Sequence, residues 1–223
     1  MASTPLESLR DAYARTLISL GEEDPRLVVV DADLSSSTRT ILFQERFPER
    51  FFNTGISEQN LMGMAAGLAL CDRTVFASTF AVFATGRAWD QVRQSICYNQ
   101  ANVKIVATHG GITVGEDGAS HQANEDIALM RALPNMTVVV PADGVETKKA
   151  VRAAAEFKGP VYIRLGRAED PTFIIKTMIV QAAWPGATVE ETLKQVTERL
   201  ERPLQETPHL AFLRSSTKAG GTT

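Results

Sequence analysis

The sequence has few residues of the kinds that build disulfides and metal centres. It contains two cysteines and three histidines among 223 residues. Cys71 and Cys97 lie in apolar or helical stretches, without the spacing of a zinc or disulfide framework. We therefore expect no metal ligands in this chain, and a reducing, cytoplasmic location.

An excess of positive charge is also missing. The 23 Lys and Arg residues are fewer than the 26 Asp and Glu residues, and they form no basic stripe. This excludes the usual electrostatic footprint of nucleic-acid binding. No run approaches the roughly 18 apolar residues that span a membrane, and the first ten residues lack the apolar core of a secretory signal. No membrane association is expected.

The sequence also lacks the common phosphate-binding loops. Neither GxxxxGK[ST] nor GxGxxG occurs in the chain. The glycines of the segment GEDG stand beside two carboxylates, which would repel an anion. We do not expect this chain to hold a diphosphate by itself.

Short β-branched runs alternate with longer amphipathic stretches along most of the chain. The runs LVVV, VKIVA and TVVV are apolar on both faces, which is typical of parallel strands covered by helices on both sides. The pattern predicts an α/β fold, a doubly wound and mostly parallel sheet spanning about residues 4 to 168. Strands are expected at 26–34, 73–79, 102–110, 136–143 and 160–166, and helices beginning near Leu6, Ser57, Ala84, Asn124 and Val145.

Ligands of such sheets collect at the carboxyl ends of the strands. The longest polar segment there is THGGITVGEDGASHQ, residues 108–122, with two histidines, Glu116, Asp117 and four glycines. A loop of this length in a compact domain is usually functional. Zinc is disfavoured because the histidines lack a cysteine or i, i+4 partner. In the segment PADGVE, by contrast, Asp143 is best explained as a helix cap.

Four segments together resemble the pyrimidine-binding domain of thiamine-diphosphate enzymes of the transketolase family, and most nearly the carboxyl-terminal subunit of split, two-chain transketolases. They are NTGISEQNLMGMAAGLAL, STFAVFATGRAWDQVR, THGGITVGEDGASHQANEDIALMRALPNMTVVVPAD and GPVYIRLGR, within about residues 6–167. The resemblance implies transfer of a two-carbon ketol unit between sugar phosphates. It implies thiamine diphosphate as cofactor, with magnesium or another divalent cation.

The resemblance assigns a catalytic role to Glu58. The matching acid hydrogen-bonds a ring nitrogen of the aminopyrimidine and so promotes loss of a proton from the thiazolium carbon. The apolar run after Glu58 disfavours an isolated carboxylate, which suits proton sharing with a ring nitrogen. From the residues alone, Glu58 is better explained as an acid favoured at a helix N-terminus, with Ser57 as the cap.

Four further residues match the lining of the cofactor pocket. Phe80 and Phe83 match aromatic walls of the aminopyrimidine site, and their i, i+3 spacing predicts a shared face at a helix start. Asp33 and Leu34 resemble residues near the cofactor and the dimer interface. Family members often have another aromatic residue where this chain has Gly86, so that part of the wall departs from the pattern.

The resemblance also implies two groups of substrate-binding residues. His109, Asp117 and His121 resemble the sugar-contacting residues, and His121 is also expected near the acceptor phosphate and in catalysis. The sugar phosphate is expected at Arg10, Ser37 and Arg167, because a guanidinium fork suits paired phosphate oxygens. Arg15 competes with Arg10 for this alignment, and Arg164 competes with Arg167.

The family's diphosphate and metal ligands, a GDG followed some thirty residues on by Asn, are not found in this sequence. The resemblance therefore implies a separate amino-terminal subunit that holds the diphosphate and most of the metal, in a dimer of heterodimers. Residues 1–170 are expected to form the pyrimidine-binding domain. Residues 171–223 are expected to be a short tail with one helix at 188–203, an unstructured end at 215–223, and no complete third domain.

The sequence leaves three functions open. One is the transketolase subunit, and another is a deoxyxylulose-phosphate synthase or the beta subunit of a 2-oxo acid dehydrogenase, which share the cofactor. The third is a non-catalytic remnant that acts as a binding partner.

Overall fold

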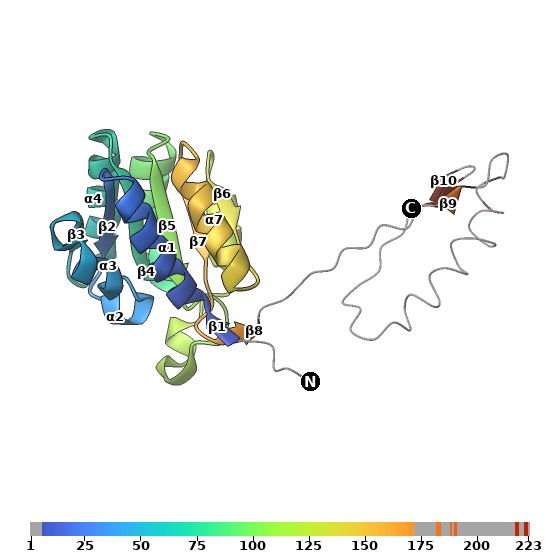
Figure 1. Ribbon diagram of the computed structural model, residues 1–223, viewed down its shortest axis with the longest axis horizontal. Coiled ribbons are helices and arrows are strands. Elements are labelled where there is room, and N and C mark those ends of the chain that lie inside the picture. Colours follow the sequence, from blue (N-terminus) through green and yellow to red (C-terminus); the bar gives the residue numbers. More distant parts are fainter. Residues whose placement is uncertain are drawn as a thin grey trace. The chain divides into compact units, whose positions relative to one another are not determined.

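The computed structural model describes residues 6–171 continuously, and beyond them residues 182–183, 188, 190, 217–218 and 221–222. The chain divides into two units, Met1–Phe173 and Ile174–Thr223 (Figure 1). All the site residues expected from the sequence fall in the first unit. Within the described residues, no helix has both the length and the apolar character needed to cross a bilayer.

The first unit is built on a six-stranded sheet in which every neighbouring pair is parallel. The strand order is β3-β2-β4-β5-β7-β6, as expected for a doubly wound fold. The strands are β2 (Leu27–Asp31), β3 (Phe51–Asn53), β4 (Thr74–Phe80), β5 (Val103–Thr108), β6 (Thr137–Val139) and β7 (Val161–Arg164). The prediction of an α/β fold with a parallel sheet is therefore confirmed.

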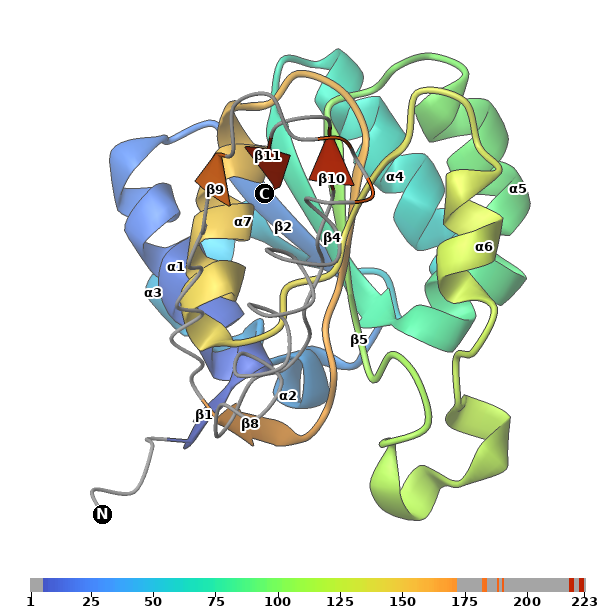
Figure 2. The ribbon, with the colours of Figure 1, turned by 90° about the vertical axis from the view of Figure 1, so that its right-hand side faces the viewer.

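Helices cover both faces of this sheet (Figure 2). On one face lie α1 (Leu9–Glu23), α3 (Ile41–Arg46) and α7 (Gly144–Glu156), and on the other α4 (Glu58–Leu70), α5 (Trp89–Gln91) and α6 (Asp126–Arg131). Successive residues of a strand belong to two separate hydrophobic cores. Val29 and Phe76 pack with the first group of helices, and Val30 and Ala77 pack with the second group. This two-sided burial explains why the strands are apolar without alternation.

Short helical segments complete the first unit. They are α2 (Ser35–Thr38), two π-helical turns, Phe83–Arg87 and Val92–Cys97, and three 3-10 turns, Pro48–Arg50, Gly115–Asp117 and Ala119–His121. The sequence pattern did not predict the helices α2 and α3 or the strand β3. These elements have three to six residues, too few to show a period, and two of the three residues of β3 are exposed.

The first helix begins later than predicted. Leu6–Ser8 form a strand, β1, which pairs antiparallel with β8 (Glu169–Pro171), so that α1 starts only at Leu9. The pairing joins segments from opposite ends of the first unit. Such a long-range contact leaves no local pattern in the sequence.

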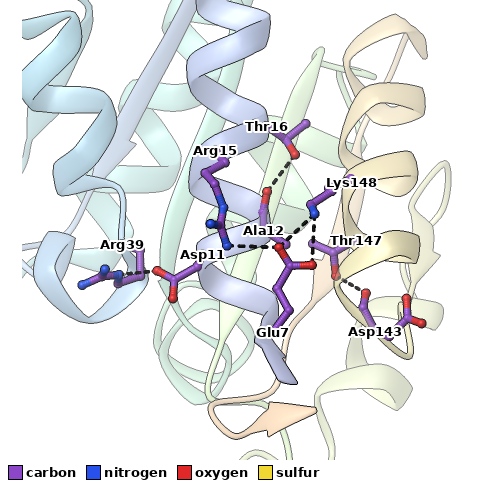
Figure 3. Close-up of polar contacts among 9 residues, drawn as sticks. All are labelled: Glu7, Asp11, Ala12, Arg15, Thr16, Arg39, Asp143, Thr147 and Lys148. Atoms are coloured by element: carbon purple, nitrogen blue, oxygen red, sulfur yellow. Dashed lines mark hydrogen bonds and ion pairs between the residues drawn. The ribbon is translucent and has the colours of Figure 1, made fainter. Parts of the chain in front are cut away.

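Ion pairs through Glu7 link α1 to α7 (Figure 3). Glu7 accepts hydrogen bonds from Arg15 Nη2 at 3.0 Å and from Lys148 Nζ at 3.0 Å. The predicted cap of α7 is confirmed, because Asp143 Oδ1 accepts from the Glu146 backbone N–H at 2.8 Å. Arg15 is therefore engaged on the α1 and α7 side of the molecule.

The second unit contains a small antiparallel sheet of order β10-β11-β9. Its strands are β9 (Ala182–Ala183), β10 (Thr217–Lys218) and β11 (Gly221–Thr222). The expectation of an unstructured end at 215–223 is thus wrong for β10 and β11, because backbone pairing requires no apolar side chains. The helix expected at 188–203 lies, apart from positions 188 and 190, outside the described residues.

Candidate functional site

The candidate site lies at the carboxyl edge of the sheet. The ends of β2, β4, β5 and β7 meet there, and the segment after β5 extends outward beyond the edge (Figure 2). The backbone at this edge is unusual, since Asp33 and His109 have positive φ values of 64° and 59°. Side chains rarely adopt this conformation, and it often marks functional segments.

Glu58 is the first residue of α4 and is 1% exposed. Its Oε2 accepts a hydrogen bond from Arg87 Nη1 at 3.1 Å. The carboxylate therefore has a cationic partner in addition to the apolar run that follows it. Sequence reasoning missed Arg87, which lies in the π-helical turn Phe83–Arg87. Its guanidinium carbon also lies 5.0 Å from the centroid of the Phe83 ring.

Phe80, Phe83, His109 and His121 form an aromatic cluster. The two phenylalanine rings are nearly parallel, at 9°, with centroids 5.9 Å apart. His109 stacks on Phe80 with centroids 3.8 Å apart, and His121 meets Phe83 edge-on at 5.3 Å. The predicted shared helix face is wrong, because Phe80 is the last residue of β4. The strand end and the following turn nevertheless bring both rings together.

His109 is the buried member of the cluster, with 2% of its surface exposed. Its Nδ1 lies 2.9 Å from the Thr108 hydroxyl. Burial, together with the positive charges of Arg10 and Arg167, lowers the pKa of His109 to about 4. The ring is thus neutral at pH 7, where one nitrogen can donate and the other can accept a hydrogen bond from a substrate hydroxyl.

The loop after β2 is held by Asp31, which sequence reasoning did not single out. This buried carboxylate accepts from the Leu34 N–H at 2.7 Å and from the hydroxyls of Thr38 and Thr40 at 2.8 and 2.9 Å. Burial raises the pKa of Asp31. The contacts fix the backbone that carries Asp33, Leu34 and Ser37. The hydroxyl residues seven and nine positions after Asp31 were the only local sign of this arrangement.

Asp33 links this loop to the segment that precedes Glu58. Its Oδ1 accepts from Asn53 Nδ2 at 3.0 Å, and Asn53 Oδ1 accepts from the Gly55 N–H at 2.9 Å. The structure therefore brings two of the predicted cofactor-binding segments side by side.

The three residues expected to bind phosphate also meet. Arg10 donates from Nη1 to the Ser37 backbone oxygen at 2.9 Å and from Nη2 to the Arg167 backbone oxygen at 3.2 Å. Their competitors are committed elsewhere: Arg15 contacts Glu7, and Arg164 is paired with the buried Asp126 at 2.7 Å. Two cationic side chains, Arg10 and Arg167, thus lie near His109 at the same edge.

Asp117 lies in the 3-10 turn Gly115–Asp117 and is exposed. Its negative charge acts on His109, opposing the two arginines. Arg167 approaches the same turn, with Nη2 3.7 Å from Glu116 Oε1. Across the part of the chain that the structure describes, no group of three or more His, Cys, Asp or Glu residues is arranged to hold a metal ion.

The family model for the transketolase pyrimidine-binding domain matches residues 7–171. Among curated relatives, a protein of Methanocaldococcus jannaschii named as a transketolase C-terminal section is 58% identical over 163 residues, or 73% of this chain and 52% of that protein. The transketolase of Mus musculus is 44% identical over 162 residues, or 72% of this chain and 26% of the mouse enzyme. The chain thus spans about half the length of the Methanocaldococcus jannaschii protein and about a quarter of the length of the mouse enzyme.

Solved structures give the same result. A split-gene transketolase, described as an inactive beta4 tetramer, is 47% identical with a TM-score of 0.68, covering 88% of this chain and 67% of that one. A transketolase of Pichia stipitis in complex with sedoheptulose 7-phosphate is 29% identical with a TM-score of 0.67, covering 77% and 28%. The match of fold, motifs and sequence shows that this chain belongs to the transketolase pyrimidine-binding domain family.

Proposed function

We propose that this chain is the pyrimidine-binding subunit of a transketolase, which transfers a two-carbon ketol unit between sugar phosphates together with a separate diphosphate-binding subunit. The observation that carries the proposal is the buried carboxylate of Glu58, which Arg87 connects to the ring of Phe83, with the ring of Phe80 nearly parallel to that of Phe83. A flat, polar aromatic ring needs both features, an apolar wall for its face and a hydrogen-bonding group for its edge.

These residues fit the aminopyrimidine of thiamine diphosphate. When bound, this cofactor supplies a carbon nucleophile for attack on the ketose carbonyl. Glu58 would hold a proton against a pyrimidine ring nitrogen, Phe80 and Phe83 would line the ring face, and Asp33 and Leu34 would border the pocket. Because Glu58 is withdrawn from water, its hydrogen bond to the ring would be stronger than at the surface.

The geometry around the aromatic cluster supports the proposed sugar contacts. Neutral His109 would exchange hydrogen bonds with a donor hydroxyl, and Asp117 would accept from another. His121, whose Nδ1 lies 3.0 Å from the Ser120 hydroxyl, would move a proton near the acceptor. Arg10, which contacts the backbone of both Ser37 and Arg167, would attract the phosphate together with Arg167, with Ser37 beside them.

A partner subunit is part of this proposal. It would supply the diphosphate and divalent cation ligands, magnesium being the expected metal. Two observations support it: a split-gene relative is described as inactive when it forms a tetramer of beta chains alone, and helix α4 exposes Gly63, Met64 and Gly67 on one side. An exposed stripe of small and apolar residues allows two helices to approach closely, which favours assembly into a dimer of heterodimers.

The test is co-expression with a transketolase amino-terminal subunit, followed by a ketol-transfer assay with xylulose 5-phosphate and ribose 5-phosphate. Glu58→Gln keeps the size of the side chain and is expected to lower turnover by about 10²-fold or more. Glu22→Ala, on the exposed side of α1, is the matched control and should retain wild-type turnover. Full activity of Glu58→Gln would refute the role of Glu58, and full activity of this chain alone would refute the two-subunit site.

A further inference from the structure

The segment 110–123, here called the site loop, is closed at its base by backbone hydrogen bonds. Gly111 N–H donates to the Ala123 oxygen at 2.8 Å, and Ala123 N–H donates to the Gly111 oxygen at 3.2 Å. Gly110 N–H donates to the Leu165 oxygen at 3.0 Å, which ties the same base to the end of β7. The loop directly follows His109 and carries Asp117 and His121.

Arg164 fills the space beneath this base. Its Nη2 donates to the Ala123 oxygen at 3.3 Å. A Cβ at Gly110 would lie 2.8 Å from Arg164 Cγ and Nε, and one at Gly111 would lie 3.0 Å from Nη2. The glycine pair is therefore what admits the arginine side chain. The φ of Gly111 is +86°, which independently favours glycine there.

Asp126 holds Arg164 in this place. The carboxylate is fully buried at the start of α6, and its Oδ2 accepts from Arg164 Nε at 2.7 Å and from the Tyr162 hydroxyl at 2.8 Å. The Arg164 side chain is 20% exposed. A buried ion pair with good geometry is costly to break, since either partner alone would be left as an uncompensated charge. The pair thus joins α6 and β7 to both stems of the site loop.

We propose that Asp126 and Arg164 are positioning residues for substrate binding, because together they fix both stems of the site loop and so the places of Asp117 and His121 relative to His109. The inference rests on the proposed function for its substrate, a phosphorylated sugar. Its geometric part, control of the site loop by the ion pair, can be tested separately.

The first experiment is hydrogen exchange by NMR on the full chain. In Arg164→Met, exchange of the Gly111 and Ala123 amides should speed up at least tenfold relative to the β5 amide of Ile105. Arg164→Lys should lie between Arg164→Met and wild type, because one ammonium cannot span both acceptors as the guanidinium fork does. Arg152→Met, which breaks the exposed pair with Glu23, is the control and should leave site-loop exchange unchanged. Wild-type exchange at Gly111 and Ala123 in Arg164→Met would overturn the proposal.

Asp126→Asn keeps the side-chain volume and is the second variant if Arg164→Met does not fold. In the assembled enzyme, it should raise KM for the sugar phosphates at least tenfold, with thiamine diphosphate affinity within twofold of wild type. An equal loss of cofactor affinity would indicate general damage and overturn a positioning role. Absence of ketol transfer by the wild-type assembly would instead refute the proposed function, while the exchange result would still decide whether the ion pair controls the loop.

Discussion

Arg87 donates a hydrogen bond from Nη1 to Glu58 Oε2, 3.1 Å away and 29 positions earlier in the chain. The two side chains differ sharply in environment, since Glu58 is 1% exposed and Arg87 is 55% exposed. The arginine therefore brings a partly solvated positive charge to a carboxylate that is otherwise withdrawn from water. The guanidinium also lies over Phe83, so it contacts two residues proposed to bind the cofactor.

We expect Arg87→Met to destabilise the chain, because Glu58 would lose its cationic partner. A double-mutant cycle with Glu58→Gln should give a coupling of about 1 kcal/mol, a modest value because solvent screens the exposed guanidinium. Urea denaturation of the two single variants and the double variant measures this coupling. If the two effects add, the contact contributes nothing to stability.

His109 should make stability depend on pH. Burial and two arginines lower the pKa of its folded form from 6.5 to about 4, so the unfolded chain binds more protons between these values. The free energy of unfolding should therefore rise as the pH increases from 4 to 6.5. The contribution of His109 is lost as the pH falls through this range, and it amounts to at most roughly 3 kcal/mol.

Denaturation of wild type and His109→Gln at several pH values checks this expectation. The variant should have a shallower dependence across the same range, because glutamine does not titrate. NMR titration of the ring gives a direct reading: protonation of His109 already near pH 6.5 would contradict the burial argument.

Gly63 offers a test of the exposed side of α4. It lies inside the helix, and no atom would lie within 4 Å of an added Cβ. Gly63→Leu should stabilise the separate chain by about 0.5–1 kcal/mol, since leucine has the higher helix propensity. The same variant should weaken assembly with the partner subunit, because its side chain would separate the packed surfaces.

Gly21→Ala provides the contrast. A Cβ there would lie 2.7 Å from Phe47 and 2.8 Å from Phe43, so overpacking should destabilise the chain. Thermal unfolding measures the stability of the Gly63→Leu and Gly21→Ala chains. Sedimentation of the mixed subunits measures assembly. Undiminished assembly of Gly63→Leu would show that this side of α4 is not the contact surface.

Much of the fold followed from the sequence because its signals are local. The unbroken apolar runs around Val29 and Val106 predicted strands buried on both faces, and Asp143 before an amphipathic stretch predicted a cap. The short strand Phe51–Asn53 and the pairing of Leu6–Ser8 with Glu169–Pro171 gave no such signal. Their hydrogen bonds depend on distant segments rather than on a repeating pattern.

The sequence by itself determined the parallel α/β fold, the family motifs and the residue types that the candidate site needs. Only the tertiary structure decided their neighbours: Arg87 beside Glu58, Asp31 beneath the β2 loop, and Asp126 with Arg164 beneath the site loop. The reason is physical. Asp126 and Arg164 are 38 positions apart in sequence, and their 2.7 Å contact exists only because the fold brings the start of α6 to the end of β7.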